Sequence, residues 1–221
     1  MSKPPPEVEP EIVRGDITQE QLDAYLAGDA LAVDTETMGL IPMRDRLCLV
    51  QLCNRAGRGT LVQIPRRPGP ISTPATGNPA PRLKTLLESE KVTKVFHFAR
   101  FDVAALSHNL AIAVRPLYCT RTASKLVRTY TDRHGLKDNL LELLDVEMDK
   151  TARHTDWSMA TLGPDQVRYA ISDVTTLLAM KAKLDDMLAR QGRAELARQC
   201  FGVIPVMARL DLLGFDLLFE H

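Results

Sequence analysis

The sequence has no excess charge of either sign, no long apolar run and no signal segment. Lys and Arg number 28, and so do Asp and Glu, which excludes bulk positive charge as the means of holding a long nucleic acid. No apolar run approaches the roughly 18 residues that a membrane helix needs, and residues 1–6, MSKPPP, lack the apolar core of a signal peptide. We therefore expect a soluble, cytoplasmic protein without a membrane anchor.

Cysteines and aromatic residues are scarce as well. The four cysteines, Cys48, Cys53, Cys119 and Cys200, form no CxxC pair, which argues against a zinc site or a disulfide framework and favours reduced thiols. Aromatic residues make up 5% of the chain, which argues against an extended groove that stacks a long single strand. Local basic patches remain open as binding surfaces.

The order of the apolar segments predicts a single α/β domain over residues 16–221, after a disordered leader over residues 1–15 that holds four prolines. Strands are predicted at 31–33, 47–53, 60–64, 94–96 and near 111–114, the first three as a meander. Helices are predicted at 17–26, with Thr18 as cap and Gln21 in the capping box, and at 81–90, 102–110, 120–129, 136–144, 163–190 and 192–213. Residues 65–81 contain six prolines and are predicted to form an exposed loop, and a helical tail covers about 192–221. This order is typical of a mixed sheet flanked by helices.

Asp34 and Glu36 follow the apolar run 31–33 and stand two residues apart. On a strand, residues i and i+2 point to the same face, so the two carboxylates converge. Two neighbouring anions repel each other unless a cation lies between them, and a hard divalent ion such as Mg²⁺ or Mn²⁺ suits oxygen ligands. Taken alone, however, the pair is a weak signal, and a solvated strand end explains it better.

Three further residues that can carry chemistry stand at the ends of apolar elements. Asp102 follows a predicted strand at the start of a helix, and alone it is best explained as an ordinary helix cap. Tyr169 and Asp173 are four residues apart on a predicted helix and share one face; a Tyr–Asp hydrogen bond that closes the helix onto the sheet is the structural alternative. Together, four carboxylates from three distant segments and one tyrosine suit a two-metal phosphodiester site.

Three blocks of the sequence resemble the motifs of the DEDDy 3′–5′ exonucleases, the ribonuclease D group. They are residues 34–36 (DTE), 97–102 (HFARFD) and 169–173 (YAISD). The resemblance spans roughly residues 30–190, with the motifs in the order of the family. Segments 44–48, 94–98, 124–126, 129–137 and 210–212 are in addition similar to nano-RNase C, a single-domain branch, from which the proline-rich segment 65–81 departs.

The resemblance implies an RNase H-like mixed sheet and a role for each motif residue. Asp34, Glu36 and Asp173 would bind the first of two divalent cations, Mg²⁺ or Mn²⁺, and Asp34 would bridge to the second. Asp102 would act on the second cation directly or through water. Tyr169 would orient the attacking water and assist its deprotonation, while one cation lowers the pKa of that water and the other stabilises the leaving oxygen.

Substrate contacts are expected from residues beside these motifs. The resemblance implies that Thr37 to Leu40 line the pocket and that Leu40 wedges between the two terminal bases; core packing after a turn explains Leu40 equally well. Phe101 is a further candidate contact. His97 is more simply a core histidine with satisfied hydrogen bonds, although its closeness to Asp102 allows a contact with a substrate phosphate.

A basic stretch precedes an acidic one in the predicted helical half of the chain. Arg121, Lys125 and Arg128 are spaced four and three apart, as on one helix face, and Arg133 follows. A solvated face is the usual explanation of such a stripe, but an exonuclease must hold a polyanion, so we favour contacts with substrate phosphates. Residues 138–149 then carry five acids and no base, which could pair with the basic stretch between subunits.

These expectations combine into a predicted function, a metal-dependent 3′–5′ exoribonuclease. It would hydrolyse short single-stranded RNA, down to dinucleotides, to 5′-monophosphates. Short substrates are favoured because the sequence has few aromatic residues and no counterpart of the helical RNA-binding domains that follow the nuclease domain in ribonuclease D. The alternatives are substantial activity on DNA, since nothing in the sequence fixes recognition of a 2′-hydroxyl, and a catalytically idle nucleic-acid-binding scaffold.

Self-association is expected from the C-terminal stretch. Residues 203–219 are unusually apolar for a chain end, and an exposed apolar patch most often marks a contact surface. A tail folded back on its own sheet is the alternative. The likeness to nano-RNase C implies a closed ring, a homo-octamer.

Overall fold

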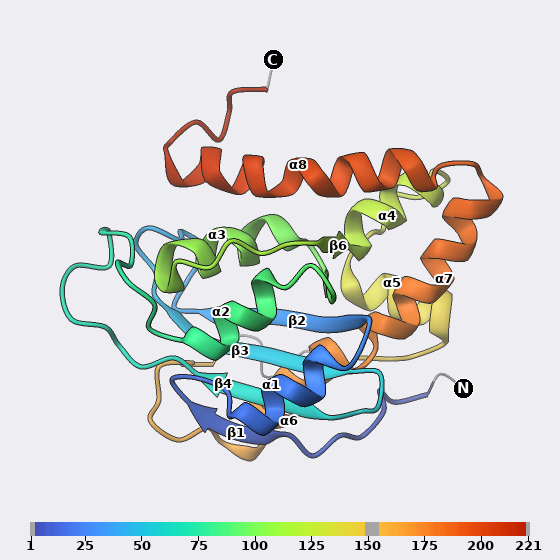
Figure 1. Ribbon diagram of the computed structural model, residues 1–221. Helices are drawn as coiled ribbons and strands as arrows, with labels where there is room; N and C mark the ends of the chain where they lie inside the picture. The colour runs from blue at the N-terminus through green and yellow to red at the C-terminus, as the bar shows by residue number, and fades with distance from the viewer. Residues whose placement is uncertain (1–2, 149–154, 220–221) are drawn as a thin grey trace.

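The central sheet is built from strands that all precede the helical C-terminal part of the chain (Figure 1). The computed structural model describes residues 3–148 and 155–219. Within these residues the strands are β1 (Glu11–Arg14), β2 (Ala30–Thr37), β3 (Leu47–Asn54), β4 (Gly59–Gln63), β5 (Thr93–Phe96) and β6 (Leu117–Cys119). Their order across the sheet is β1-β4-β3-β2-β5-β6. β3 is antiparallel to β2 and β4, whereas the pairs β1–β4, β2–β5 and β5–β6 are parallel.

Helices cover both faces of this sheet, and further helices lie beyond one end of it. They are α1 (Gln19–Leu26), α2 (Pro81–Glu88), α3 (Ala99–Leu110), α4 (Thr120–Val127), α5 (Leu136–Leu144), α6 (Pro164–Thr175), α7 (Leu177–Arg190) and α8 (Ala194–Leu212). α6 packs on β2, β3 and β4, α3 packs on β2, β3 and β5, and α8 lies along the outer side of α3 (Figure 1).

Neighbouring residues of β4 show that α1 and α6 lie on opposite faces. The Tyr25 hydroxyl of α1 hydrogen-bonds the Thr60 hydroxyl over 2.6 Å, while Ile171 of α6 packs against Gly59. Successive residues of a strand point to opposite faces. A Cβ atom at Gly59 would come within 2.6 Å of the Ile171 side chain, so the glycine is what allows α6 to approach the sheet.

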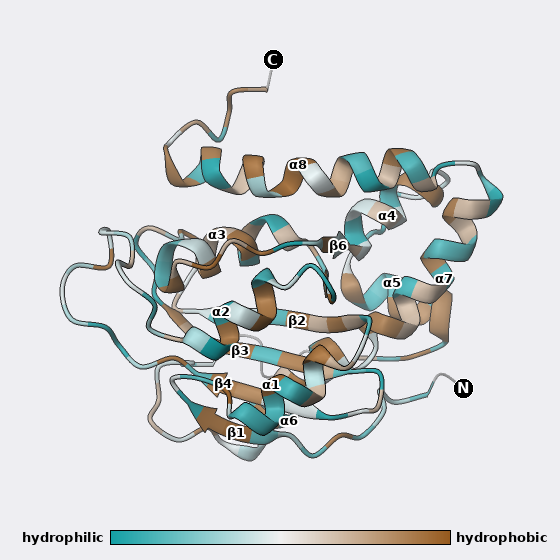
Figure 2. Ribbon diagram, viewed as in Figure 1, coloured by the Kyte–Doolittle hydropathy of each residue, from teal (hydrophilic) through white to brown (hydrophobic). Residues whose placement is uncertain are grey.

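The central strands are apolar over nearly their whole length because helices cover both of their faces. β3 (LCLVQLCN) is buried from Leu47 to Cys53, and β2 (ALAVDTET) from Ala30 to Val33. Figure 2 shows these strands as hydrophobic segments enclosed by helices of mixed hydropathy. β2 changes to polar residues at Asp34, so its carboxyl end leaves the core where the acids begin.

Several sequence predictions are confirmed. The fold is a mixed sheet flanked by helices with a helical C-terminal part, and β2, β3 and β4 form the predicted meander. α1 begins at the predicted cap, since the Thr18 hydroxyl accepts from the Gln21 backbone amide and the Gln21 side chain accepts from the Thr18 amide. The proline-rich segment between β4 and α2, which is described throughout, contains no helix or strand.

Three predictions about the elements were wrong. The leader is not disordered throughout, because Glu11–Arg14 adds β1 to the edge of the sheet, parallel to β4. The strand expected near 111–114 lies instead at Leu117–Cys119, where it pairs with β5. The helix expected over 163–190 is two helices, α6 and α7, which meet at Thr176.

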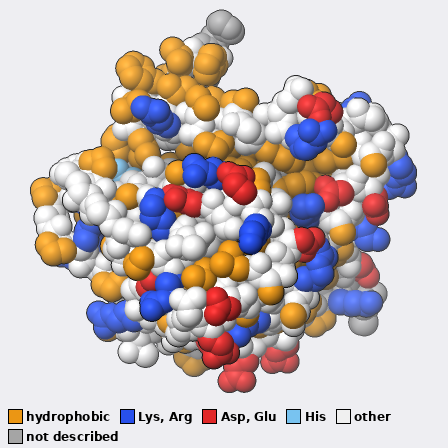
Figure 3. All heavy atoms as spheres, viewed as in Figure 1, with side chains coloured by type: hydrophobic (Ala, Val, Ile, Leu, Met, Phe, Trp, Pro, Cys, Tyr) orange, Lys and Arg blue, Asp and Glu red, His pale blue; other side chains and the backbone are white. Residues whose placement is uncertain are grey.

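The segment after α8 exposes a group of large apolar side chains. Those exposed by more than half are Leu213, Phe215, Leu217, Leu218 and Phe219. Figure 3 shows hydrophobic side chains gathered over this segment, above α8. The described part of the tail therefore does not fold back onto the sheet. Among the helices in residues 3–148 and 155–219, none combines the length and apolar character needed to cross a bilayer.

Candidate active site

Three carboxylates from β2 and α6 meet at the polar end of β2. Asp34 and Glu36 point to the face of the sheet that α6 covers, and Asp173 lies on the third turn of α6. One carboxylate oxygen of each lies within 4.8 Å of the others. Asp173 is buried, whereas Asp34 and Glu36 are partly exposed. The two sequence segments predicted to converge thus form one acidic cluster.

Asp102 reaches the same end of β2 from the other face. It lies in the first turn of α3, is 4% exposed, and accepts a hydrogen bond of 2.6 Å from the Thr35 hydroxyl. Thr35 stands between the two acids of β2 and points away from them, as strand geometry requires. The N-cap of α3 is Phe98, so the alternative of Asp102 as a helix cap is wrong.

The acids are held in an environment that disfavours their charge. Burial raises the pKa of Asp34 from 3.8 to about 7, and a hydrogen bond from the Thr35 backbone opposes the rise. Burial, followed by the nearby charge of Asp34, raises the pKa of Asp102 well above its ordinary value. Buried anions of this kind are stable when a cation neutralises them.

The donor set fits a hard divalent cation. Three carboxylates supply oxygen atoms only, which is the ligand type that Mg²⁺ and Mn²⁺ prefer. Gln51 of β3, opposite Asp34 in the register, donates to the Asp34 carboxylate over 3.4 Å. The side-chain oxygen Oε1 of Gln51 is buried and accepts no hydrogen bond from the described residues, so the site offers more oxygen acceptors than the protein itself satisfies.

Tyr169 lies one turn before Asp173 on α6. Its ring packs against Trp157, with centroids 6.0 Å apart, and the side chain is partly exposed. Trp157 is 5% exposed, so it is a buried packing anchor for this ring. The partly exposed phenol therefore lies one helical turn from Asp173 of the acidic cluster.

The expected substrate contacts lie around this cluster with different exposures. The Thr37 hydroxyl donates to the Gly39 carbonyl over 2.5 Å, and Leu40 is 83% exposed, so core packing does not explain Leu40. His97 Nδ1 donates to the Thr120 hydroxyl over 2.9 Å, because that hydroxyl itself donates to the Phe96 carbonyl. Phe101 is partly buried in the first turn of α3.

The basic stripe is divided by the end of α4. Arg121 lies over the Phe98 ring, 4.4 Å from its centroid, and Lys125 is exposed. Arg133 pairs with Asp138 over 2.8 Å. Arg128, however, follows the last residue of α4 and is fully buried.

The expectation that Arg128 contacts substrate was wrong. Its guanidinium donates to the Glu142 carboxylate, to the Ser124 hydroxyl, to the side-chain oxygen Oδ1 of Asn139 and to the backbone carbonyl of Arg133. All of its donor nitrogens are thus used inside the protein. Arg128 is a structural cation that ties the end of α4 to α5.

Two residues of the site were missed in the sequence. Gln51 interrupts the apolar strand Leu47–Cys53, and a polar residue within a fully buried strand is the signal that marks it. Thr35 stands in the DTE block, and its β-strand position between two converging acids directs its side chain to the opposite face. Its hydroxyl holds Asp102, so it links the two faces of the site.

A mixed sheet that gathers carboxylates at one strand end suits a nuclease-type metal site. A family model described as 3′–5′ exonuclease matches residues 11–189, and the chain belongs to this family. Ribonuclease D of Nitrobacter hamburgensis is 33% identical over 166 residues, which are 75% of this chain and 40% of that protein. The chain spans less than half the length of the ribonuclease D relatives that it matches.

Solved structures resemble the chain over nearly its full length. The structure of Brucella melitensis NrnC bound to pGG is 42% identical, covers 97% of this chain and 100% of that one, and has a TM-score of 0.86. Brucella melitensis NrnC with bound Mg²⁺ is 43% identical, covers 96% and 98% of the two chains, and has a TM-score of 0.84. The resemblance to ribonuclease D and nano-RNase C and the RNase H-like fold are thereby confirmed.

Proposed function

We propose that the chain is a metal-dependent 3′–5′ exoribonuclease that hydrolyses short RNA, down to dinucleotides, to nucleoside 5′-monophosphates. The convergence of Asp34, Glu36 and Asp173 within 4.8 Å carries this proposal, because three partly or fully buried carboxylates at one point need a cation. Membership of the 3′–5′ exonuclease family supplies the direction of attack.

Each acid has a distinct part in the proposed reaction. Asp34, Glu36 and Asp173 would hold one divalent ion, and Asp34 and Asp102 would hold a second. Such ions would lower the pKa of a bound water and stabilise negative charge on the leaving 3′ oxygen. Thr35 fixes the Asp102 carboxylate through its 2.6 Å hydrogen bond, so that this acid keeps one orientation.

Tyr169 orients the attacking water. Its hydroxyl lies on the same face of α6 as Asp173, one turn away, and its ring is supported by Trp157. A hydroxyl on a supported ring can accept or donate a hydrogen bond to water without loss of position. Tyr169 is therefore the positioning group of the nucleophile, and it assists removal of the proton.

Short substrates are supported by the contacts available beside the acids. NrnC of Brucella melitensis, which resembles this chain over its whole length, has been solved with pGG. Leu40 is 83% exposed at the same strand end as the acids, which suits an apolar wedge between two bases. Arg121 and Lys125 supply positive charge at the start and middle of α4.

Hydrolysis of an RNA length series tests the proposal. Substrates from two to about 20 nucleotides, labelled at the 5′ end, are incubated with Mg²⁺, Mn²⁺ or EDTA, and matched DNA oligonucleotides measure activity on DNA. We expect metal-dependent turnover that is fastest for the shortest RNAs, since short ends bind without an extended groove. Absence of hydrolysis with either metal, or the same hydrolysis by Asp173→Asn, would contradict the assignment and favour an idle scaffold.

We further propose that the chain self-associates through its exposed apolar tail, and that the assembly is a homo-octameric ring. Leu217 and Phe219 are each exposed by more than 60%. Light scattering on the wild type and on Leu217→Asp with Phe219→Asp measures the mass in solution. We expect the double variant to dissociate, whereas Leu141→Asp, on exposed α5 surface, keeps the assembly. A monomeric wild type would contradict the proposal.

A further inference from the structure

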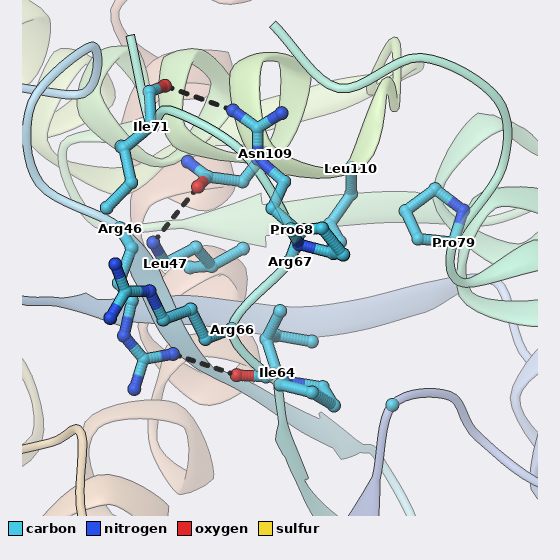
Figure 4. Close-up of a pocket in the computed structure, with 12 residues that line it drawn as sticks. Arg46, Leu47, Ile64, Arg66, Arg67, Pro68, Ile71, Pro79, Asn109 and Leu110 are labelled. Atoms are coloured by element: carbon cyan, nitrogen blue, oxygen red, sulfur yellow. Dashed lines mark hydrogen bonds between the residues drawn. The ribbon is translucent and has the colours of Figure 1, made fainter. Parts of the chain in front are cut away.

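A pocket of about 280 Å³ lies under the proline-rich loop between β4 and α2. Its walls are this loop, the start of β3 with Arg46 and Leu47, and the end of α3 with Asn109 and Leu110 (Figure 4). The volume is close to the lower end of the range for small-molecule sites. It has room for one small molecule, and a nucleic-acid strand would not fit inside it.

Three guanidinium groups line the pocket, and none of its lining residues is acidic. Arg46 donates to the carbonyls of Ile64, over 3.2 Å, and Ser158, over 3.4 Å. Arg66 is exposed and forms no ion pair with the described residues. Hydrogen bonds from Ser158 and, to a lesser extent, the charge of Arg46 lower the pKa of Asp156, but Asp156 does not line the pocket. Carbonyl groups orient a guanidinium but do not neutralise its charge.

Arg67 provides a donor that the protein itself leaves unused. Its Nη2 atom donates to the carbonyl oxygens of Ile71, over 3.0 Å, and of Thr73, so the guanidinium is fixed in place (Figure 4). Its Nε atom is buried and has no hydrogen-bond partner in the described residues. A buried donor without an acceptor is costly, and an anion in the pocket would supply the acceptor.

The remaining wall of the pocket is apolar and is held in place. Pro65, Pro68, Ile71 and Pro79 contribute much of it, and proline restricts the backbone of the loop. His108 of α3 bonds the Ile71 carbonyl over 2.6 Å and accepts from the Ala75 amide, over 2.8 Å, through its own carbonyl. The loop is therefore tied to α3 at two points, and the pocket is formed before a ligand arrives.

Asn109 does not compete for the ligand. Its side-chain oxygen accepts from the Leu47 amide over 3.2 Å, and its nitrogen donates to the Ala105 carbonyl over 3.0 Å. The side-chain polar groups left for a ligand are the guanidinium groups. The pocket thus combines fixed positive charge with an apolar wall, and its chemistry matches an anion that carries an apolar or aromatic part.

The pocket is separate from the acidic cluster but next to the segment that leads to it. Asp102 and Asn109 are seven residues apart on α3, which is about 10 Å along a helix. On the strand side, the Arg46 carbonyl accepts from the Met38 amide over 3.1 Å. A molecule in the pocket would therefore border the segment 38–46, which carries Leu40.

We propose that this pocket binds a small organic phosphate, with the phosphate group on Arg46, Arg66 and Arg67 and the organic part against the proline wall. Guanidinium groups bind phosphate oxygens in a bidentate geometry. Among small organic phosphates, we choose a nucleoside 5′-monophosphate as the ligand. This choice rests on the proposed function, because such monophosphates are its products. Binding there brings a product against the segment that carries Leu40.

Isothermal titration of the full chain tests the proposal. AMP, adenosine and inorganic phosphate are titrated separately in EDTA, where product binding through metal ions is absent. The variants are Arg66→Gln and Arg67→Gln, with Arg55→Gln as the matched control, because Arg55 is an exposed arginine with one long ion pair to Asp29 at 3.6 Å. Thermal unfolding verifies that each variant is folded; Arg66 forms no side-chain hydrogen bond or ion pair with the described residues.

We expect AMP to bind more tightly than phosphate, adenosine to bind poorly, and both pocket variants to weaken AMP about tenfold or more, with Arg55→Gln unchanged. Equal affinity for phosphate and AMP would overturn the role of the apolar wall. Absence of AMP binding, binding unchanged in both pocket variants, or binding abolished by Asp34→Asn would overturn the site. The titration measures binding and not hydrolysis. A negative titration therefore does not contradict the proposed nuclease activity, and a negative nuclease assay does not contradict binding of AMP in the pocket.

Discussion

Asp34→Asn is expected to stabilise the metal-free protein at pH 8 and to leave its stability nearly unchanged near pH 4. The carboxyl of Asp34 has a pKa of about 7 in the folded chain against an ordinary 3.8. The folded state therefore binds the proton more tightly than the unfolded state between these two values. Stability from this group is present at low pH and is lost as the pH rises through about 7. Asparagine has nearly the same shape and never ionises, so it removes this loss.

The magnitude follows from the shift. At 1.36 kcal/mol per pKa unit, a rise from 3.8 to about 7 corresponds to about 4 kcal/mol as an upper bound. Asp34 is partly exposed, so water relaxes around the charge and we expect about half of that, roughly 2 kcal/mol. For a chain of this length, such a gain raises Tm by about 4–8 °C.

Circular dichroism melts in EDTA at pH 5, 6, 7 and 8 measure the effect. The difference in Tm between Asp34→Asn and wild type should grow with pH, while Asp29→Asn, an exposed acid, shows little change. Mg²⁺ should then raise the Tm of the wild type, because a ligand stabilises the folded state to which it binds. It should not raise the Tm of Asp34→Asn, which lacks one of the carboxylates proposed to bind the ion. A variant that is less stable than wild type at pH 8, or a pH-independent difference, would refute the reasoning.

Three further changes separate chemistry from structure. Tyr169→Phe should lower kcat by about 10²-fold or more with little change in the Mg²⁺ dependence of Tm; an unchanged kcat would make the hydroxyl structural only. Leu40→Ala should raise KM for dinucleotides with thermal stability unchanged within about 0.5 kcal/mol, because its side chain is 83% exposed; unfolding of the variant would instead indicate core packing. Arg128→Met should destabilise the fold by about 3 kcal/mol, measured by urea unfolding, because it leaves several buried acceptors unpaired; a stable variant with weakened RNA binding would restore Arg128 as a substrate contact.

The elements that the sequence predicted well are those with strong local signals. β3 and β4 are apolar runs separated by a glycine-rich turn, and α1 carries a complete capping box at Thr18 and Gln21. β1 was missed because it is a short edge strand with a polar sequence, EIVR, and only its parallel pairing with β4 makes it a strand. The break between α6 and α7 was missed because the apolar periodicity continues across Thr176.

The candidate site likewise has features that the sequence predicted and features that it did not. The sequence by itself determined which candidate residues share a face: the i, i+2 spacing of Asp34 and Glu36 places them on one face of a strand, and the spacing of Tyr169 and Asp173 does the same on a helix. Only the tertiary structure decided that these faces meet, because the contact of α6 with β2 joins residues more than 130 positions apart. It also decided that Arg128 is buried, since the helix ends one residue earlier and turns the side chain inward. Local spacing fixes the direction of a side chain along its own element, but burial and charge partners depend on elements that pack from elsewhere in the chain.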